Sequence, residues 1–583
     1  RPRHTRLAHF PDMSVRYFVM ATLFAQIRGF AIKPRASPSH RLHVRALFSA
    51  TEKQSKATTK KAKDSKENNQ FYINPRDADY AQWYQDVIQN SDMVDSSPVK
   101  GCMVIKPWGM AIWDRLKLTL DSKIIDSGAQ NAYFPIFIPS SFLSKEAEHV
   151  EGFAMESAVV THYRLKKNAN VDKDNKNILV PDPDAELEEP LIVRPTSETM
   201  IWHMFGQWIK NHRDLPLKMN QWANVVRWEM RTRPFLRSAE FLWQEGHTAH
   251  ATDEEADACA RQMLDVYEEV VQDLLAVPVI KGTKSPSERF AGADETYTIE
   301  ALMQNGWALQ SGTSHFLGQN FAKAFDVLFQ NKEGKRELVW ATSWGVSTRL
   351  IGALVMTHSD DQGLVLPPKV APIQVVVVPV GKPGTEDAQK VSEAVDKLVD
   401  ELQAKGVRVH VDDRDYLRPG PKFFEWERKG VPVRLELGPR DLGNNCAIMS
   451  ARTGRHAGEK KQLALDTITE EVAKVLEEMQ ADLFDAAVAR RQERTYTTGS
   501  YDEMKGVFDA IDAAEEKGIP EKQGFFLVPW KCSAENEKKI KEDCRATIRC
   551  YPFEENKDFV AGSKKCFYSG EDATHMALFS RAY

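Results

Sequence analysis

The chain has 583 residues, 42% of them hydrophobic, which is enough for about three or four domains with cores of their own. A net charge of -5 excludes a globally basic protein, so any contact with nucleic acid must use a local patch. Seven cysteines are too few for a disulfide scaffold, and Cys102, Cys259 and Cys446 stand alone, as thiols of a reducing compartment do.

The N-terminal segment is basic. Residues 1–50 hold eight arginines and one lysine against a single acid, a composition typical of a mitochondrial or chloroplast transit peptide. A disordered basic tail on a cytoplasmic protein is the alternative. The apolar run 17–32 is interrupted by Gln26 and Arg28, so we expect no membrane span. Residues 51–70 are rich in lysine and lack aromatic side chains, which predicts a disordered linker.

Folded sequence begins near Phe71. Over residues 109–128, apolar side chains recur every four positions and the run closes on a glycine, which predicts an amphipathic helix. Its buried face would consist of Ile112, Leu116, Leu120 and Ile124. A strand is predicted over 132–138, and the charged segment 162–190 predicts a surface hairpin or loop.

The segment RPTSETMIW places Thr196 and Glu198 at a predicted junction between a strand and a helix. Helix capping by Thr196 or Ser197 is the ordinary explanation of such a triplet. If the junction instead borders a pocket, Glu198 supplies a negative charge for an ammonium group and Thr196 a neutral acceptor.

The segment from Arg227 to Glu245 predicts two strands separated by a break at Pro234. With a period of two, Arg227, Glu229 and Arg231 point to one face of the first strand. The opposite, packed face would consist of Val226, Trp228 and Met230. On the second strand, one face would consist of Arg237, Phe241, Trp243 and Glu245.

This concentration of arginine and aromatic side chains suits a nucleoside triphosphate. Guanidinium groups pair bidentately with phosphate oxygens, and a flat aromatic ring stacks on a base. A solvated salt-bridge ladder across a hairpin explains the same charges.

Two later segments add polar groups. Gln310, Thr313 and His315 lie among glycines, which let the backbone approach a ligand closely, although a turn would also need them. The helix that follows Ser347 is apolar almost all round and therefore buried, so Arg349 needs a partner for its charge. A bound phosphate or an internal carboxylate would serve.

At this point the chain resembles a known family. FPIFIPSSF, RWEMRTRPFLR with EFLWQEGH, and GVSTRLIG resemble the three signature segments of class II aminoacyl-tRNA synthetases. RPTSET, FAGADETYTIEA and QSGTSHFLGQNF are similar to the prolyl-tRNA synthetases of the eukaryotic and archaeal type. The match runs from about residue 74 to residue 583, and the basic segment 1–50 indicates an organelle-targeted form.

The resemblance implies an α/β fold with an α+β catalytic domain, in which helices flank an antiparallel sheet. The implied domains are a class II catalytic domain over 71–366, an α/β anticodon-binding domain over 367–485, and a small α/β domain over 486–583 that resembles the family's zinc-binding domain. In the second domain, strands alternate with a helix, which predicts a parallel-rich sheet. That helix carries apolar side chains at Val391, Val395, Leu398 and Leu402. Local basic surface for tRNA, or merely solvated charge, would come from Lys422, Arg428, Lys429 and Arg440.

The family's roles carry over to matching positions as implications of the resemblance. The residues implied for ATP are Arg227, Arg237, Phe241, Gln310, Thr313, Ser347 and Arg349. Those implied for L-proline are Thr196, Glu198, Arg227 and His315. The implied catalytic residues are Arg227, Arg349 and Glu229. Glu229 and Glu240 would orient the arginines or a Mg²⁺ ion.

The implied activity is that of a proline-tRNA ligase, which forms prolyl-adenylate from L-proline and ATP and transfers the prolyl group to tRNA(Pro), releasing AMP and pyrophosphate. A homodimer is expected from the first signature segment around Pro139. Two alternatives stay open. One is a catalytically inactive tRNA-binding or regulatory relative, which should have lost Arg227, Arg349 or Glu198. The other is a threonyl or glycyl enzyme.

The chain departs from the family in two places. Ser359 stands where relatives have glycine between His358 and Asp360. In the last domain, Cys532, Cys544, Cys550 and Cys566 are spaced by 12, 6 and 16 positions, which is not the pattern of two close cysteine pairs. We therefore expect no structural zinc. Only 99 residues separate Glu245 from Gly345, too few for the large editing insertion of the bacterial-type enzymes.

Overall fold

The computed structural model describes residues 71–145, 157–169, 177–514 and 517–583. The predicted transit peptide and lysine-rich linker lie outside these residues. Within the described ranges, no helix is long and apolar enough to cross a membrane.

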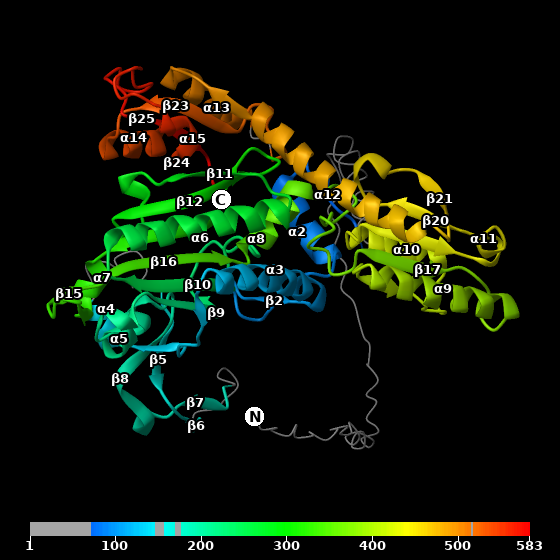
Figure 1. Ribbon diagram of the computed structural model, residues 1–583, viewed down its shortest axis with the longest axis horizontal. Coiled ribbons are helices and arrows are strands. Elements are labelled where there is room, and N and C mark those ends of the chain that lie inside the picture. Colours follow the sequence, from blue (N-terminus) through cyan, green and yellow to red (C-terminus); the bar gives the residue numbers. More distant parts are fainter. Residues whose placement is uncertain (1–70, 146–156, 170–176, 515–516) are drawn as a thin grey trace, which may run out of the picture. The chain divides into compact units, whose positions relative to one another are not determined.

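Among the described residues, an 11-stranded sheet forms the framework of the catalytic part (Figure 1). Its order is β22-β23-β25-β24-β11-β12-β13-β16-β10-β9-β3. The run from β11 to β9 is antiparallel throughout. These strands are β11 (Val279–Thr283), β12 (Glu295–Leu302), β13 (Ala308–Gly318), β16 (Trp340–Ser347), β10 (Glu240–His250) and β9 (Leu217–Val226).

Helices pack against this sheet and bury its main core. The helix α6 starts where the Thr252 side chain accepts a hydrogen bond from the Glu255 amide, and three acids occupy its first turn, as the helix dipole favours. The helices of this layer are α2 (Tyr80–Asn90), α3 (Pro107–Asp126), α6 (Asp253–Asp273) and α8 (Arg349–His358). The predicted helix over 109–128 is confirmed as α3, whose Ile112, Leu116, Leu120 and Ile124 are buried.

The predicted strand over 132–138 is partly wrong, because the chain changes sheets there. Pro135 has no amide to donate to a ladder, and Phe134 is buried in a separate apolar cluster. The strands on either side are β3 (Gln130–Asn131) and β4 (Phe137–Pro139). The second joins β8 (Glu186–Val193) and β5 (Val159–His162). In the described part of 162–190, β6 (Leu165–Lys167) and β7 (Leu179–Pro181) pair antiparallel, which confirms the predicted hairpin.

The smaller elements of the catalytic part complete its edges. They are β1 (Val94–Ser96), β2 (Met103–Ile105), α4 (Ser140–Lys145), α5 (Glu198–Trp208), α7 (Asn320–Ala324), β14 (Leu328–Gln330) and β15 (Arg336–Leu338). Of these, α5 matters most for function, because its first turn borders the central cavity described below.

The continuously described stretch 367–485 contains a five-stranded sheet of order β18-β17-β19-β20-β21. β17 is parallel to both of its neighbours, whereas the β19-β20 and β20-β21 pairs are antiparallel. The predicted parallel-rich sheet is therefore mixed. Its strands are β17 (Val375–Pro379), β18 (Val409–Val411), β19 (Val433–Leu437), β20 (Cys446–Ala451) and β21 (Lys460–Ala464). The covering helices are α9 (Glu386–Ala404), α10 (Pro419–Arg428), α11 (Pro439–Gly443) and α12 (Ile468–Glu493).

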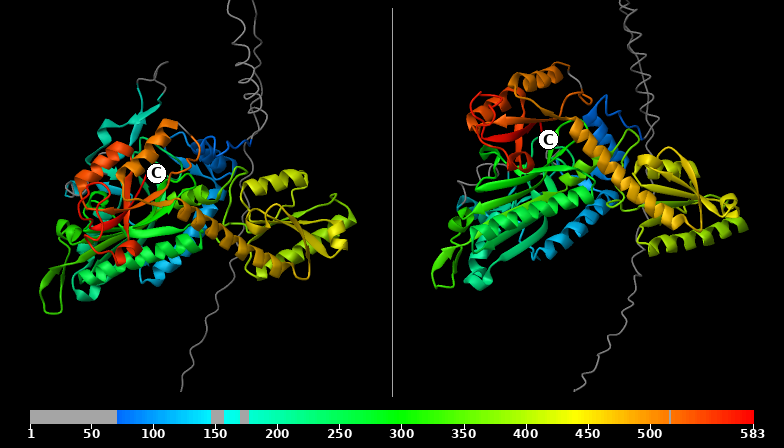
Figure 2. Two further views of the ribbon diagram at one scale, coloured as in Figure 1. Left: turned by 90° about the horizontal axis from the view of Figure 1, so that it is seen from above. Right: turned by 45° about the horizontal axis from the view of Figure 1, so that its top comes forward.

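The last segment adds strands to the catalytic sheet (Figure 2). β24 pairs antiparallel with β11 through Gly282↔Pro552 and Thr283↔Tyr551, so the C-terminal strands continue the central sheet. The strands are β22 (Thr495–Thr497), β23 (Phe525–Trp530), β24 (Thr547–Pro552) and β25 (His575–Ser580). The helices are α13 (Tyr501–Ala514), α14 (Ala534–Cys544) and α15 (Phe553–Lys557).

Candidate active site

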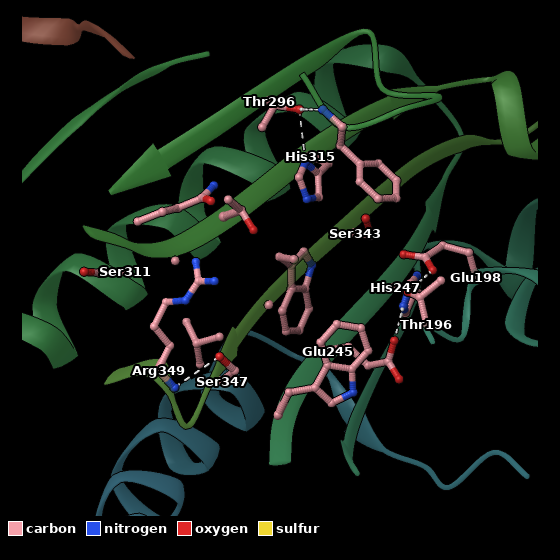
Figure 3. A pocket seen from close by; sticks show the side chains of 18 of the residues that line it. Thr196, Glu198, Glu245, His247, Thr296, Ser311, His315, Ser343, Ser347 and Arg349 are labelled. Atoms are coloured by element: carbon pink, nitrogen blue, oxygen red, sulfur yellow. Dashed lines mark hydrogen bonds and ion pairs between the residues drawn. The ribbon is translucent and has the colours of Figure 1, made fainter. Parts of the chain in front are cut away.

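A cavity of about 310 Å³ opens over β10, β13 and β16, beside the first turns of α5 and α8 (Figure 3). Nine of the predicted site residues line it. They are Thr196, Glu198, Arg227, Phe241, Gln310, Thr313, His315, Ser347 and Arg349. Figure 3 shows Arg349 and Ser347 at one end of the cavity, and Thr196 and Glu198 at the other.

Two predicted site residues are not among the described residues that line this cavity: Glu229 and Arg237. The predicted first strand ends at Val226, because the Glu229 amide donates to the Arg227 carbonyl at 2.6 Å and closes a three-residue turn. The Glu229 carboxylate then accepts from the Arg231 amide at 3.0 Å.

The predicted packed face of that strand is wrong for the same reason. Beyond the turn the chain is an exposed loop, in which Trp228 is 54% and Met230 68% exposed. The second predicted strand begins only at Glu240, so Arg237 lies in the loop before it and is exposed. From Phe241 onward the predicted alternation is confirmed, since Phe241, Trp243 and Glu245 all line the cavity.

The junction before α5 serves the cavity and not the helix end. Ser197 occupies the N-cap position, yet its side chain makes no capping bond within the described residues. Its hydroxyl donates instead to Glu245 at 2.6 Å, and the Thr196 hydroxyl donates to Glu198. The capping explanation of this triplet is therefore wrong for its side chains.

Glu245, which was predicted on this face of β10, has a buried partner that was not predicted, His247. Glu245 and His247 are 3% and 1% exposed, with 3.2 Å between the carboxylate and the imidazole Nε2. Burial alone would raise the pKa of Glu245, but hydrogen bonds from His247, Ser197 and Gln221 outweigh it and lower that pKa. Burial alone would lower the pKa of His247, but Glu245 and Glu198 outweigh it and raise that pKa. Continuing the β10 alternation by two residues would have found His247.

Arg227 interacts with both ends of the cavity, because the charge of Glu198 acts on it and its own charge lowers the pKa of Arg349. Its Nε donates to the Pro195 carbonyl at 3.0 Å, and its guanidinium lies 5.6 Å from the Phe241 ring centroid and 5.4 Å from that of Trp243. Burial lowers the pKa of Arg227, while the charges of Glu198 and Glu245 oppose the shift. The guanidinium thus lies beside two aromatic rings in a partly desolvated site, where an anion would bind strongly.

Arg349 stands at the first turn of α8 in an electropositive environment. Its Nε donates to the Leu236 carbonyl at 3.2 Å. Burial, followed by the like charges of Arg237, Arg227 and Arg549, lowers the pKa of Arg349 to about 10. Of the two partners left open above, these surroundings favour a phosphate, which the N-terminal end of a helix also attracts.

His315, on β13, lines the same cavity as Glu198. Its Nδ1 lies 3.0 Å from the Thr296 hydroxyl, and its ring packs on Phe290 at 4.7 Å between centroids. Burial, with a smaller contribution from His247, lowers the pKa of His315 to about 3, so the imidazole is neutral near pH 7. The His315 imidazole therefore adds no positive charge to this part of the cavity.

The predicted basic surface of residues 367–485 is wrong for two of its four residues: Lys422 and Arg428 are buried, whereas Lys429 is half-buried and Arg440 is exposed. Lys422 is 4% exposed and its ammonium donates to the Asp412 carbonyl at 2.9 Å. Arg428 donates to the Asn90 carbonyl at 2.6 Å and lies 3.7 Å from the Phe71 ring centroid. Both cations are used inside the structure, because burial of a charge demands a partner.

The four C-terminal cysteines differ in exposure: Cys532 is exposed, whereas Cys544, Cys550 and Cys566 are buried. In the described part of the chain, no group of three or more His, Cys, Asp or Glu side chains could hold a metal ion.

An antiparallel sheet that presents arginines, an aromatic ring and a buried carboxylate to one cavity defines a class II aminoacyl-tRNA synthetase core. Residues 181–358 match the family model described as tRNA synthetase class II core domain (G, H, P, S and T), which confirms the predicted fold class. Residues 374–476 match the anticodon binding domain, and residues 514–583 match the model described as prolyl-tRNA synthetase, C-terminal.

Similar proteins narrow the class to one family. The chain is 55% identical over 511 residues to the proline-tRNA ligase of Porphyromonas gingivalis, an alignment that spans 88% of this chain and 99% of that protein. It is 54% identical over 514 residues to the proline-tRNA ligase of Bacteroides fragilis, with the same two shares. The chain belongs to the prolyl-tRNA synthetase family.

A solved structure agrees with this assignment. The prolyl-tRNA synthetase of Cryptosporidium parvum, crystallised with L-proline and AMP, has a TM-score of 0.77 and 36% sequence identity, covering 88% of this chain and 98% of that one. The same enzyme with halofuginone and AMPPNP gives a TM-score of 0.78 at 37% identity. Because the class II core model spans five specificities, it is these relatives and the C-terminal match that exclude the threonyl and glycyl alternatives.

Proposed function

We propose that the cavity between Thr196 and Arg349 is where this chain, an ATP-dependent proline-tRNA ligase, activates L-proline. The observation that carries the proposal is the placement of Glu198, Arg227 and Arg349 in one cavity, with the acid and the last arginine at opposite ends. An amino acid and a triphosphate present this distribution of charge, with an ammonium group at one end and phosphates at the other. The inactive alternative is disfavoured because all three side chains are present and face the cavity.

At the proline end, the Glu198 carboxylate pairs with the secondary ammonium group, and Thr196 orients Glu198 through its hydroxyl. Arg227 binds the proline carboxylate and positions it for attack on the α-phosphate. The neutral His315 and the Phe290 ring enclose the pyrrolidine without adding charge.

At the ATP end, Arg227 also contacts the α-phosphate, Arg349 binds the outer phosphates and Phe241 stacks on adenine. Gln310, Thr313 and Ser347 hold the nucleoside. The set of cavity residues supports these roles. Arg237 is not among the described residues that line the cavity, but its charge lowers the pKa of Arg349, and its predicted contact with the outer phosphates stays part of the proposal.

The chemistry requires no nucleophilic side chain. The proline carboxylate oxygen attacks the α-phosphorus in line, the bond to the bridging oxygen breaks, and pyrophosphate leaves. The terminal ribose hydroxyl of tRNA(Pro) then attacks the prolyl carbonyl carbon, and AMP leaves. Positioning and electrostatic stabilisation by Arg227 and Arg349 lower both barriers. We assign no step to Glu229, which is not among the described residues that line the cavity and whose carboxylate accepts from the Arg231 amide.

Mg²⁺ would accompany the triphosphate, neutralising charge that develops on the phosphates. Such an ion is held by phosphate oxygens, waters and one or two carboxylates, and does not need an all-protein cage. Glu198 and Glu245 lie at the proline end, so Glu240, which was predicted to orient the arginines or this ion and is exposed at the start of β10, is the acid we propose to face it.

We further propose that the enzyme is of the eukaryotic and archaeal type and works in a mitochondrion or plastid. The short spacing between Glu245 and Gly345 supports the type, and the basic composition of residues 1–50 supports the location. A fluorescent fusion to residues 1–70 tests the location. Import into an organelle is the expected result, and diffuse cytoplasmic signal would overturn it.

A homodimer is proposed from the small sheet around β4. Tyr133, Phe137 and Val159 are 72%, 43% and 55% exposed, which is unusual for large apolar side chains of one surface region. Light scattering should give twice the mass of one chain, and Phe137→Asp should shift the protein toward monomer. A monomeric wild type would contradict the proposal.

The ligase activity itself is tested by charging. The enzyme should attach labelled proline to a tRNA(Pro) transcript in the presence of ATP, and much less to the same transcript with a substituted anticodon. Failure to charge the native transcript would overturn the proposal.

A further inference from the structure

The seam between β11 and β24 joins the C-terminal segment to the catalytic sheet very closely. A Cβ added to Gly282 would lie 2.5 Å from the Tyr551 carbonyl and 2.7 Å from the side chain of Cys550. Only glycine allows the two backbones to approach in this way. Side chains of β24 can therefore contact β12, the strand next to β11 in the sheet.

One arginine crosses this seam. Arg549, on β24, is 7% exposed, and its Nε donates to the Glu300 carboxylate on β12 at 3.1 Å. Glu300 is fully buried and also accepts from Lys284 at 2.8 Å and from the Thr298 hydroxyl at 2.9 Å. Two buried cations thus share one buried carboxylate, which fixes Glu300 firmly in place.

Glu300 stands opposite an irregular point in the cavity wall. β12 and β13 pair Ile299 with Gly312 and Glu300 with Gln310, so the register skips Ser311. This β-bulge changes which side chains face the ligand. Gln310, Ser311, Gly312 and Thr313, the residues at and beside this irregularity, all line the cavity.

We propose that Arg549 is a positioning residue of the nucleotide site, which holds the bulge of Gln310 to Thr313 in shape by fixing Glu300 across the seam. This inference rests on the proposed assignment of Gln310 and Thr313 to ATP. It makes the C-terminal segment a structural part of the ATP pocket, although none of the described residues of that segment lines the cavity. The charge of Arg549 also reaches Arg349, whose pKa it lowers.

The test compares Arg549→Met with the matched control Arg545→Met. Arg545 is an exposed arginine of the same segment, and the carboxylate with which it pairs is that of Asp512 and not that of Glu300. Arg549→Met leaves Lys284 to neutralise Glu300, so no buried charge is orphaned and the fold is expected to persist. Thermal unfolding checks that expectation, and Arg549→Lys tests whether a restored cation rescues the site.

Proline-dependent ATP-pyrophosphate exchange supplies the readout. Arg549→Met should raise the KM for ATP on the order of tenfold and leave the KM for proline within about twofold of wild type. A remote mutation that displaces binding groups by about 1 Å can cost an enzyme up to about a hundredfold in rate, so an effect of this size is reasonable. Arg549→Lys should recover part of this loss, and Arg545→Met should match wild type. Equal rises in both KM values, or a lower melting temperature with an unchanged KM ratio, would overturn the inference.

Gln310→Ala distinguishes the positioning role of Arg549 from the assignment of Gln310 to ATP, on which that role rests. If Gln310→Ala raises the KM for ATP and Arg549→Met does not, the positioning role fails and the nucleotide assignment stands. If neither variant changes that KM, the assignment fails too. If both raise it, the double variant should show less than the sum of the two effects, because they act on one bulge. Full additivity would refute the route through the bulge.

Discussion

Replacing Arg227 by methionine should abolish most adenylate formation. The guanidinium interacts with both the proline and ATP ends of the cavity, so the change removes contacts to the substrate carboxylate and to the α-phosphate. A hydrogen bond to a charged group contributes about 1.5–3 kcal/mol, and loss of a donor aimed at developing charge costs about 10²–10³ in rate. Two contacts of about 1.5–3 kcal/mol each give about 3–6 kcal/mol, or a fall in kcat/KM of about 10²–10⁴.

The charge balance of the cavity pushes this loss to the upper end of the range. Glu198 and Glu245 stabilise the charged form of Arg227, and without the arginine they would repel an incoming triphosphate. The assay is proline-dependent ATP-pyrophosphate exchange, with Arg231→Met as control. Arg231 is an exposed arginine of the same loop that is not among the described cavity residues. The reasoning is refuted if Arg227→Met stays within threefold of wild type or loses no more than Arg231→Met.

Three further outcomes are expected. Glu198→Gln should raise the KM for proline by about 10–100-fold, since a charge-assisted bond contributes about 1.5–3 kcal/mol, and leave the KM for ATP within about twofold; equal rises in both would argue against the assigned end. The Glu245-His247 pair has a lowered carboxylate pKa and a raised imidazole pKa, so its stabilisation is complete between the ordinary values of 4.5 and 6.5. Stability should fall as the pH rises through the folded pKa of His247 or drops through that of Glu245. Chemical unfolding of Glu245→Gln should lack this dependence, and an unchanged pH profile would contradict the pairing. Lys422→Met should cost about 1 kcal/mol in urea unfolding, because it removes the hydrogen bond to the Asp412 carbonyl while Arg414 still pairs with the Asp412 carboxylate; a loss of about 3 kcal/mol or more would show that Asp412 depends on Lys422 as its main partner.

Helical periodicity was the most reliable guide to the fold. The four-residue recurrence from Ile112 to Ile124 identified α3, because a surface helix must bury one stripe and the stripe is visible in the sequence. The alternation from Arg227 to Arg231 misled, since charged and apolar side chains also alternate in an exposed loop. Whether an apolar residue such as Met230 packs depends on tertiary neighbours that a single sequence does not contain.

The polar members of the site were predicted better than the features that shape it. Glu198 and Arg349 stood out because charges beside apolar helices need partners. The bulge at Ser311 left no such trace, because it depends on the pairing of two strands and on an arginine more than 230 positions away. His247 could have been included by extending the alternation two residues beyond Glu245, but the burial of the pair depends on Ser197 and Gln221 from other elements.

The central claim is that one cavity binds proline at the Glu198 end and ATP at the Arg349 end. It is tested most directly by ATP-pyrophosphate exchange with the purified wild-type enzyme and each amino acid in turn. Proline should support exchange at least about a hundredfold better than threonine or glycine, because specificity from buried polar contacts reaches this level. Absence of exchange with proline, alongside activity with threonine or glycine, would contradict the account.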